Sequence, residues 1–448
     1  MLFGKYCSPS ASHVHQVRSR LGCICDKAGG SSTSYRVSNT DAPKTLKVQF
    51  NPFDPAVREN PYPFYEMLRE KDPVHRTLFD VVLLTRYEDV AYTLKSSEFS
   101  RDMEKYSNNP LAVSRRASRE TQFEHTKSIL NLDPPDHTRL RRILSMSFTS
   151  RAVESLRPRV RELVGEVLSK AREAGRMELV GDLALPVPFT VISEMLGISR
   201  ERSVEVREWS KLITGSLEPT ASLDEIREAG DAMASFVEYL KEVISEKKRK
   251  PADDMISSMV EIQRQGDPLT DDELAAFALL LYVAGHETTV NVIGNSVLSL
   301  LRNPEQGQMV RQRGIDMNGV DELLRIDAPV QLTVRIPLVP VFYTVGDERI
   351  QIEPGEMVMT SLGGANHDPS VFAAPGVLDL SRENAKSHMS FASGIHYCMG
   401  AGLARMQAQE VLGALFQAFS EINVNGDIQW RDRLTLRGVE RLELGLGV

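Results

Sequence analysis

The 448-residue sequence is poor in cysteine and has no excess of basic residues. It holds four cysteines: Cys7, Cys23 and Cys25 lie near the N-terminus, and only Cys398 lies in the rest. A lone thiol cannot build a disulfide framework, so the disulfide-stapled class is excluded and a reducing, cytoplasmic compartment is expected. The net charge of −8 argues against a nucleic-acid-binding protein, because such proteins usually carry a basic excess.

Long apolar runs are also missing. The longest, from Leu274 to Gly285, is too short to span a bilayer, and the N-terminal residues lack the apolar core that a signal peptide needs. Hydrophobic residues nevertheless make up 42% of the chain and charged residues 25%, a balance that allows a large buried core. The sequence therefore predicts a soluble monomer without a membrane span.

Residues 1–45 differ in composition from the rest of the chain. Their second half is rich in Gly, Ser and Thr, as linkers are. Their first half contains possible metal ligands, namely Cys7, His13, His15, Cys23 and Cys25. A Cys-x-Cys pair without a second pair is a poor zinc pattern, so a disordered leader or an upstream start codon explains the segment better. One ordered domain is expected over residues 46–448.

Helical periodicity dominates this domain, with strands expected between Thr333 and Thr360, which indicates a mainly α fold with smaller β regions (α+β). The longest predicted helix begins after a capping box at Thr270 and Glu273 and ends at Arg302, before Asn-Pro. It is apolar on most faces, so it must run through the middle of the molecule.

The centre of this helix reads AGHETT, from Ala284 to Thr289, and is polar for such a position. One interpretation is a helix kink in which a hydroxyl group satisfies a freed carbonyl. The other is a distortion beside a ligand, in which Glu287 and Thr288 are parts of a proton relay. A zinc-protease site is excluded, because Val290 stands where the second histidine of HExxH is required. The stretch alone leaves the first two interpretations open.

Cys398 lies in the segment FASGIHYCMG, directly before an amphipathic helix. The dipole and the free backbone N–H groups at a helix N-terminus stabilise a thiolate. Gly394 and Gly400 let the backbone come close to a large flat ligand. The alternative is a small buried residue at a turn, the commoner fate of a lone cysteine.

Two charged pairs occur at helical spacing. Glu322 and Arg325 lie at i,i+3 in DELLRID and can form an ion pair. His137 and Arg141 lie at i,i+4 in DPPDHTRLRR and can grip carboxylates. Each pair alone is most often an ordinary solvated helix face, but with the AGHETT and cysteine segments they form an ordered set of motifs.

This set, FxxGxHxCxG with ELLR, AGHETT and DPPDHxRLR, resembles the cytochrome P-450 family, and the soluble bacterial type in particular. The resemblance covers about Phe50 to Val448. It implies the cytochrome P-450 fold, with a long central helix over a haem b whose iron is bound by the thiolate of Cys398. The cofactor-binding positions that it implies are His137, Arg141, Ala284, Gly285, Arg335, Phe391, Gly394, His396, Cys398 and Gly400.

The resemblance also assigns roles to side chains. His137, Arg141, Arg335 and His396 match positions that hold the haem propionates. Glu287 and Thr288 match the catalytic acid–alcohol pair that delivers protons during oxygen activation. Glu322, Arg325 and Arg382 match a buried network that supports the cysteine loop. One departure is Ala392, which stands where the family usually has glycine.

The activity implied is insertion of one oxygen atom from O2 into an apolar small organic substrate, by hydroxylation or epoxidation. Too few residues follow Cys398 for a fused flavin reductase, so a separate ferredoxin and its NAD(P)H-dependent reductase are the expected electron donors. A peroxide-driven peroxygenase and a non-catalytic haem sensor or carrier are the alternatives on this fold. Gln331 and Thr333, among aliphatic residues of a candidate pocket segment, suggest a mainly apolar ligand with a few polar handles.

Overall fold

The computed structural model describes residues 51, 54–107, 128–216, 218, 221–266 and 268–447, all within one unit, Lys47–Val448. The disordered leader predicted for residues 1–45 lies outside the described residues, and so do Cys7, Cys23 and Cys25.

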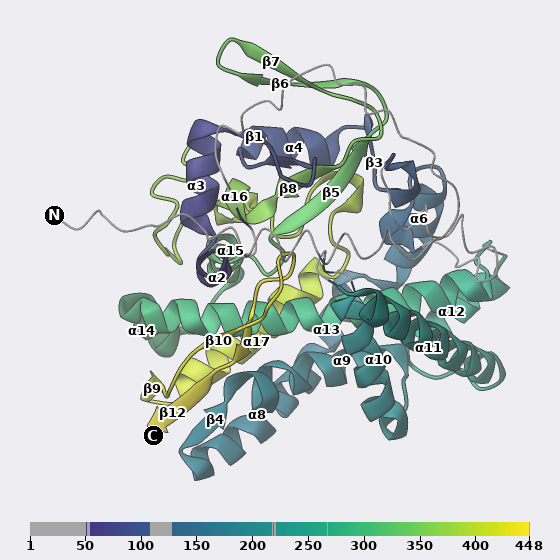
Figure 1. Cartoon of the computed structure of the whole chain (residues 1–448). Coiled ribbons are helices and arrows are strands. Elements are labelled where there is room, and N and C mark those ends of the chain that lie inside the picture. Colours follow the sequence, from purple (N-terminus) through teal and green to yellow (C-terminus); the bar gives the residue numbers. More distant parts are fainter. Residues whose placement is uncertain are drawn as a thin grey trace. The chain divides into compact units, whose positions relative to one another are not determined.

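Helices make up most of the described chain (Figure 1). Two of the longest begin with a capping box. The side chain of Ser222 or Thr270 accepts a hydrogen bond from the backbone N–H of the third helical residue, and the glutamate at that position accepts one from the backbone N–H of the cap residue. The helices are α2 (Pro55–Glu59), α3 (Tyr62–Lys71), α4 (Tyr87–Lys95), α6 (Asp136–Ser147), α7 (Ser150–Ser155), α8 (Arg157–Ala174), α9 (Pro186–Leu196), α10 (Ser203–Gly215), α11 (Leu223–Arg249), α12 (Met255–Arg264), α13 (Asp271–Arg302), α14 (Pro304–Arg313), α15 (Met317–Ile326), α16 (Leu362–Asn366) and α17 (Ala401–Ala418). A π-helical segment, η3 (Leu179–Ala184), and short 3-10 turns, among them η6 (Gly394–His396), join them.

The strands of the described residues form four small sheets. They are β1 (Val74–Arg76), β2 (Val82–Leu84), β3 (Phe99–Ser100), β4 (Arg176–Glu178), β5 (Leu332–Pro337), β6 (Val341–Val345), β7 (Glu348–Ile352), β8 (Val358–Ser361), β9 (Glu421–Val424), β10 (Gln429–Trp430), β11 (Val439–Arg441) and β12 (Glu443–Gly447). The largest sheet has the order β1-β2-β8-β5-β3, in which β2 and β8 are parallel and the other neighbours antiparallel. The predicted mainly α fold with smaller β regions is confirmed, including strands in the region between Thr333 and Thr360.

The long helix α13 has the bounds that the sequence predicts. Its N-terminal half packs in one hydrophobic cluster with α6, α10, α11 and α12. Its C-terminal half packs in a second cluster with α8, α14, α15 and α17, and Figure 1 shows α13 running through the middle of these helices. The polar stretch Ala284 to Thr289 therefore falls where one cluster gives way to the other.

Two stretches, Leu179–Leu196 and Asp271–Arg302, are long and apolar enough to cross a membrane by length and composition alone. Of their most apolar windows, 56% and 61% respectively are buried inside the protein. The hydrophobic clusters that these helices help to form account for their apolar character.

Candidate active site

Cys398 lies in a tight loop between η6 and α17. Its backbone N–H donates to Phe391 O at 3.0 Å. Gly394 has a φ of 71°, and a Cβ at this position would lie 2.4 Å from Leu94 O, so only glycine fits here. Ala392 also has a positive φ, 57°, which costs a residue with a Cβ about 1–2 kcal/mol. The backbone of this loop thus favours glycine at position 392, and the alanine keeps the loop at the expense of some strain.

The side chain of Cys398 is exposed, although protein groups surround the sulfur on several sides. These groups keep water away from the sulfur, and this desolvation raises the pKa of the thiol above its ordinary value. The backbone N–H groups of Gly400 and Ala401 and the charges of Arg141 and Arg405 oppose this rise and lower the pKa, as a helix N-terminus should. Desolvation is the larger effect, so the helix alone does not make this cysteine a thiolate; a coordinated metal ion would remove the proton outright.

Four basic side chains gather near the loop: Arg101, His137, Arg335 and His396. The ring centroids of His137 and His396 lie 4.3 Å apart. Burial, followed by the charges of its three neighbours, lowers the pKa of His396 to about 3. Burial, followed by the charge of Arg101, lowers the pKa of Arg335 to about 9. The pKa of His137 is also lowered, first by burial, so both histidine rings are neutral at pH 7 and the positive charge of the cluster rests on Arg101 and Arg335.

Asp133 is the carboxylate of the described residues whose charge acts on this cluster. Its oxygens already accept hydrogen bonds from the backbone N–H of Arg101 (2.9 Å) and from Lys105 Nζ (2.6 Å). In addition, Nδ1 of His137 is buried without a hydrogen-bond partner. Two arginines beside two histidine rings, one of which has a ring nitrogen without a partner, are suited to holding carboxylates from outside the chain.

The centre of α13 continues without a break through AGHETT. Thr288 Oγ1 donates to Ala284 O (2.7 Å), and Thr289 Oγ1 donates to Gly285 O (2.8 Å), one turn back in each case. Ala284 is exposed although most of the helix around it is buried. The helix therefore borders accessible space at Ala284. The hydroxyl group of Thr288, which donates to Ala284 O, lies on the same side of the helix.

Glu287 is buried and contacts two arginines. Its Oε1 accepts hydrogen bonds from Arg431 Nη1 at 2.9 Å and from Arg433 Nη1, both in the segment between β10 and β11. Within the described residues no hydrogen bond joins Glu287 to Thr288, although the two are adjacent in sequence. If they work as a pair, either a side chain rotates or a water molecule links them.

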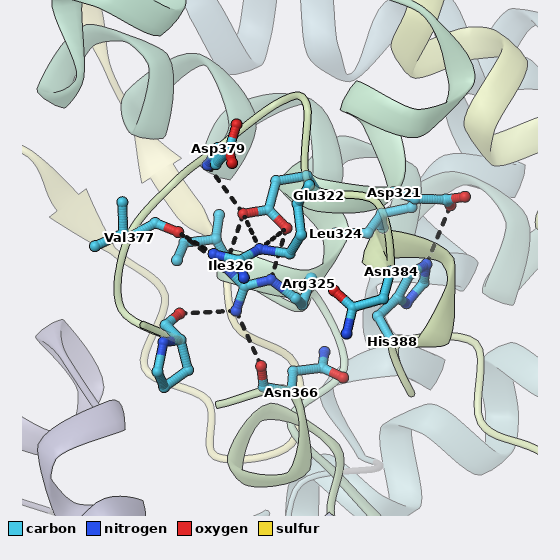
Figure 2. Close-up of polar contacts among 12 residues, drawn as sticks. Asp321, Glu322, Leu324, Arg325, Ile326, Asn366, Val377, Asp379, Asn384 and His388 are labelled. Carbon is cyan, nitrogen blue, oxygen red and sulfur yellow. Dashed lines mark hydrogen bonds and ion pairs between the residues drawn. The ribbon is translucent and has the colours of Figure 1, made fainter. Parts of the chain in front are cut away.

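Glu322 and Arg325 form a fully buried ion pair on α15 (Figure 2). Arg325 Nε lies 2.6 Å from Glu322 Oε2, and Arg325 Nη2 lies 2.8 Å from Oε1. Arg382 Nε adds a contact of 3.1 Å to Glu322, and the backbone N–H of Asp379 donates to it at 3.0 Å. The remaining N–H groups of Arg325 donate to the carbonyls of Asn366, Pro375 and Val377. The charges of this network are thus paired, as their burial demands.

Asn366 connects this network to the cysteine loop. Its backbone oxygen accepts from Arg325 (3.0 Å), its Oδ1 accepts from the backbone N–H of Met389 (2.6 Å), and its Nδ2 donates to Ser390 Oγ (2.8 Å). Phe391, the first residue of the cysteine motif, follows directly. The ion pair on α15 is therefore connected to the entrance of the loop through Asn366, and Ser390 Oγ also donates directly to Leu324 O of α15 (2.7 Å).

Comparisons with known proteins identify this arrangement. Residues 74–313 and 318–433 match the family model described as Cytochrome P450. The chain belongs to the cytochrome P450 family.

Cytochrome P450 107B1 of Saccharopolyspora erythraea is 36% identical over 409 residues, which cover 88% of this chain and 97% of that protein. Vitamin D(3) 25-hydroxylase of Pseudonocardia autotrophica is 33% identical, over 87% of this chain and 94% of that one. Among solved structures, P450BioI in complex with a hexadec-9Z-enoic acid ligated acyl carrier protein has a TM-score of 0.78 at 33% identity, with 87% and 99% of the two chains covered.

Cytochromes P450 are monooxygenases, and the family implies a haem bound by a cysteine thiolate. The residues present fit this cofactor. The thiol of Cys398 is exposed, and the charges of Arg101 and Arg335, beside His137 and His396, suit the two propionate groups. The small side chain of Ala284 keeps α13 free of a large group at its accessible point, whereas a Cβ at Gly285 would face Ile192 Cδ1 at 3.4 Å.

The structure brings three of the four predicted propionate-binding residues together, namely His137, Arg335 and His396. The fourth, Arg141, donates from Nη2 to Tyr397 O (2.7 Å) and so contacts the cysteine loop. Arg101 is a member of the cluster that the sequence did not indicate. No motif marks it, and its hydrogen bond to Val334 O (2.9 Å) joins residues 233 positions apart.

Replacing Arg335 with methionine should weaken haem retention and yet stabilise the protein without haem. The change removes a buried cation whose lowered pKa reflects its burial and the charge of Arg101, but it also removes a partner for a carboxylate. Because hydrogen bonds to charged groups contribute about 1.5–3 kcal/mol, haem dissociation should accelerate by roughly 10- to 100-fold. Haem transfer to an acceptor protein and the Tm of the apoprotein measure the two effects. Arg176→Met, at an exposed position of β4, is the control and should change neither quantity.

Proposed function

We propose that this chain is a haem-thiolate monooxygenase that inserts one oxygen atom from O2 into an apolar small organic molecule. The observation that carries the proposal is the exposed Cys398 thiol, held in a preformed loop near the guanidinium groups of Arg101 and Arg335. When bound, the haem supplies oxygen activation and the oxidant. The chain itself binds that group, orients the substrate and moves protons.

Each role follows from the contacts. Cys398 Sγ is the iron ligand, and Ser393 to Gly400 fix its position. Arg335, His137 and His396, with Arg101, hold the propionates through charge-assisted hydrogen bonds. Thr288 Oγ1, now donating to Ala284 O, can rotate to donate on the accessible side of α13. Glu287 restores that proton through an intervening water molecule.

Thr288→Ala should uncouple electron consumption from product formation. The variant lacks the hydroxyl group that passes protons on, so reduced oxygen leaves as hydrogen peroxide. General acid–base groups contribute at least about 10²-fold, so the product formed per NAD(P)H should fall by roughly an order of magnitude or more. Thr289→Ala is a matched control, since Thr289 makes the same type of hydrogen bond one turn back but is buried. Tight coupling in Thr288→Ala would remove the relay role.

The alternatives account for less of the site. A peroxide-driven peroxygenase does not need the acid–alcohol pair, and Glu287 and Thr288 are both present. A haem sensor or carrier would not need it either. The electron donors that we propose are a ferredoxin and an NAD(P)H-dependent ferredoxin reductase in the cytoplasm, as the bacterial relatives suggest.

The substrate class is proposed from the relatives and the composition of the pocket segments. The relatives named above include a vitamin D(3) hydroxylase and a protein crystallised with a fatty acyl carrier, both with largely apolar ligands. A spectral titration of the ferric protein with fatty acids, terpenoids, steroids and macrolides tests the proposal. A ligand class that shifts the iron from low to high spin would be identified as the substrate class. If no free ligand caused a shift, acyl chains bound to a carrier protein would be tested next.

A further inference from the structure

The segment between β10 and β11 links two parts of the candidate active site. Arg433 contacts Glu287 at the centre of α13. Thr435 O accepts a hydrogen bond from the backbone N–H of Gln331 at 2.9 Å, and β5, which carries Arg335 of the cation cluster, begins at the next residue. The segment therefore borders the region in which the substrate is expected, between α13 and the propionate-binding residues.

Two successive backbone N–H groups of this segment hold one carboxylate from another part of the chain. Oε2 of Glu218, in the loop between α10 and α11, accepts hydrogen bonds from the N–H groups of Leu434 (2.9 Å) and Thr435 (3.2 Å). Successive N–H groups that converge on one point make an anion-binding concavity. The segment thus contains a carboxylate site that is built from backbone atoms.

Glu218 is an imperfect occupant of this site. The residue is only 7% exposed, and its Oε1 is buried without a hydrogen-bond partner. Burial raises the pKa of its carboxyl group, although the backbone N–H groups of residues 434–436 and the charge of Arg433 oppose this rise. A buried carboxylate oxygen without a donor keeps its desolvation penalty uncompensated. A carboxylate whose second oxygen reaches a donor or water can therefore replace Glu218.

The side chain of Gln331, expected to be a polar handle for the substrate, is engaged elsewhere. Its Nε2 donates to Ala328 O (2.7 Å) and approaches Tyr62 OH at 3.4 Å. Its Oε1 would lie 2.2 Å from a Cβ at Gly363, so the amide packs against α16. The backbone N–H groups that Glu218 holds are the better candidates for a polar handle in this region.

We propose that the backbone N–H groups of residues 434–436 form a carboxylate subsite for the substrate, and that Glu218 occupies it until the substrate binds. The inference rests on the proposed function and narrows its substrate class to apolar chains that end in a carboxylate. The incoming carboxylate accepts the hydrogen bonds of Leu434 and Thr435, and the side chain of Glu218 turns to water. Because one carboxylate replaces another, the charge beside Arg433 stays balanced.

The first arm of the test compares dodecanoic acid with methyl dodecanoate and 1-dodecanol, by spectral titration of the ferric protein and by calorimetry. The three probes share one apolar chain and differ in the group that would enter the subsite. Hydrogen bonds to a charged group are the stronger ones, so the acid should bind roughly tenfold more tightly than the ester and the alcohol. Equal affinities of the three probes, or no binding of the acid, would overturn the proposal.

The second arm uses Glu218→Ala, which removes the internal occupant. This variant should bind dodecanoic acid severalfold more tightly than the unaltered protein does, with the affinities for the ester and the alcohol unchanged. Glu218→Gln keeps a neutral acceptor for the loop and should give the same change to a smaller extent. Glu208→Ala, at an exposed glutamate of α10, is the control and should change no affinity.

Two results of the second arm would contradict the subsite. If Glu218→Ala changed the affinities for all three probes equally, Glu218 would only tether its loop to the segment. An unchanged affinity for the acid would mean that Glu218 and the substrate do not compete. The ferrous–CO spectrum of each variant distinguishes these results from a failure of the proposed function, because an intact thiolate-type band leaves the haem-thiolate assignment in place.

Discussion

Replacing Cys398 with serine is expected to abolish the thiolate-type absorption of the ferrous–CO complex and, with it, the monooxygenase activity. A serine hydroxyl does not push electron density onto iron as a thiolate does, and that donation favours O–O cleavage. Serine is close to cysteine in size, and the backbone hydrogen bond from residue 398 to Phe391 O (3.0 Å) does not depend on the side chain. The loop should therefore persist while the ligand changes. The measurement is the difference spectrum of the reduced, CO-treated protein.

Cys23→Ser supplies the matched control, since it makes the same exchange at a cysteine outside the cytochrome P450 motif. Its spectrum should equal that of the unaltered protein. Survival of the thiolate-type band in Cys398→Ser would mean that another group binds the iron, and the assignment of the whole site would fail with it.

The features that the sequence predicted well are local ones. The bounds of α13 follow from a capping box at one end and Asn-Pro at the other, and both signals lie within a few residues of the helix ends. The pairing of Glu322 with Arg325 follows from i,i+3 spacing on one helix. Family motifs supplied the roles of these residues, because a pair at this spacing is most often part of an ordinary solvated helix face.

The features that the sequence did not predict are contacts across long separations. Glu287 is adjacent to Thr288 in the chain, yet its contacts are to Arg431 and Arg433, 144 and 146 residues away. The segment that carries these arginines has no periodicity that would direct them to α13. Thiol ionisation was predicted from the helix N-terminus, which does lower the pKa of Cys398, but the larger effect of desolvation depends on the packed loop. Tertiary packing decides which of these opposing effects on the pKa is larger, and packing cannot be read from a single sequence.

Arg325→Met should lower the free energy of unfolding by about 3–5 kcal/mol, the usual cost of removing one partner from a buried ion pair. The methionine fills much of the volume of the arginine, but Glu322 keeps only Arg382 as a charged partner, and the carbonyls of Asn366, Pro375 and Val377 lose their donor. Urea unfolding of the full chain with haem measures the loss. Arg227→Met is the control, because Arg227 and Asp224 have the same i,i+3 spacing at 73% and 81% exposure, where an ion pair contributes only about 0–1 kcal/mol.

The same variant tests whether the network supports the cysteine loop. The backbone oxygen of Asn366 accepts a hydrogen bond from Arg325, and its side chain hydrogen-bonds to Met389 and Ser390. Loss of the arginine should therefore loosen the residues that lead to Cys398. We therefore expect Arg325→Met to retain less haem under conditions where the chain is still folded, with part of the ferrous–CO absorption shifted away from the thiolate-type band. If stability fell while the band stayed whole, the pair would stabilise α15 and its neighbours without holding the iron ligand. If Arg325→Met lost both stability and the thiolate-type band, and Arg227→Met lost neither, the buried ion pair would both stabilise the fold and hold the cysteine loop.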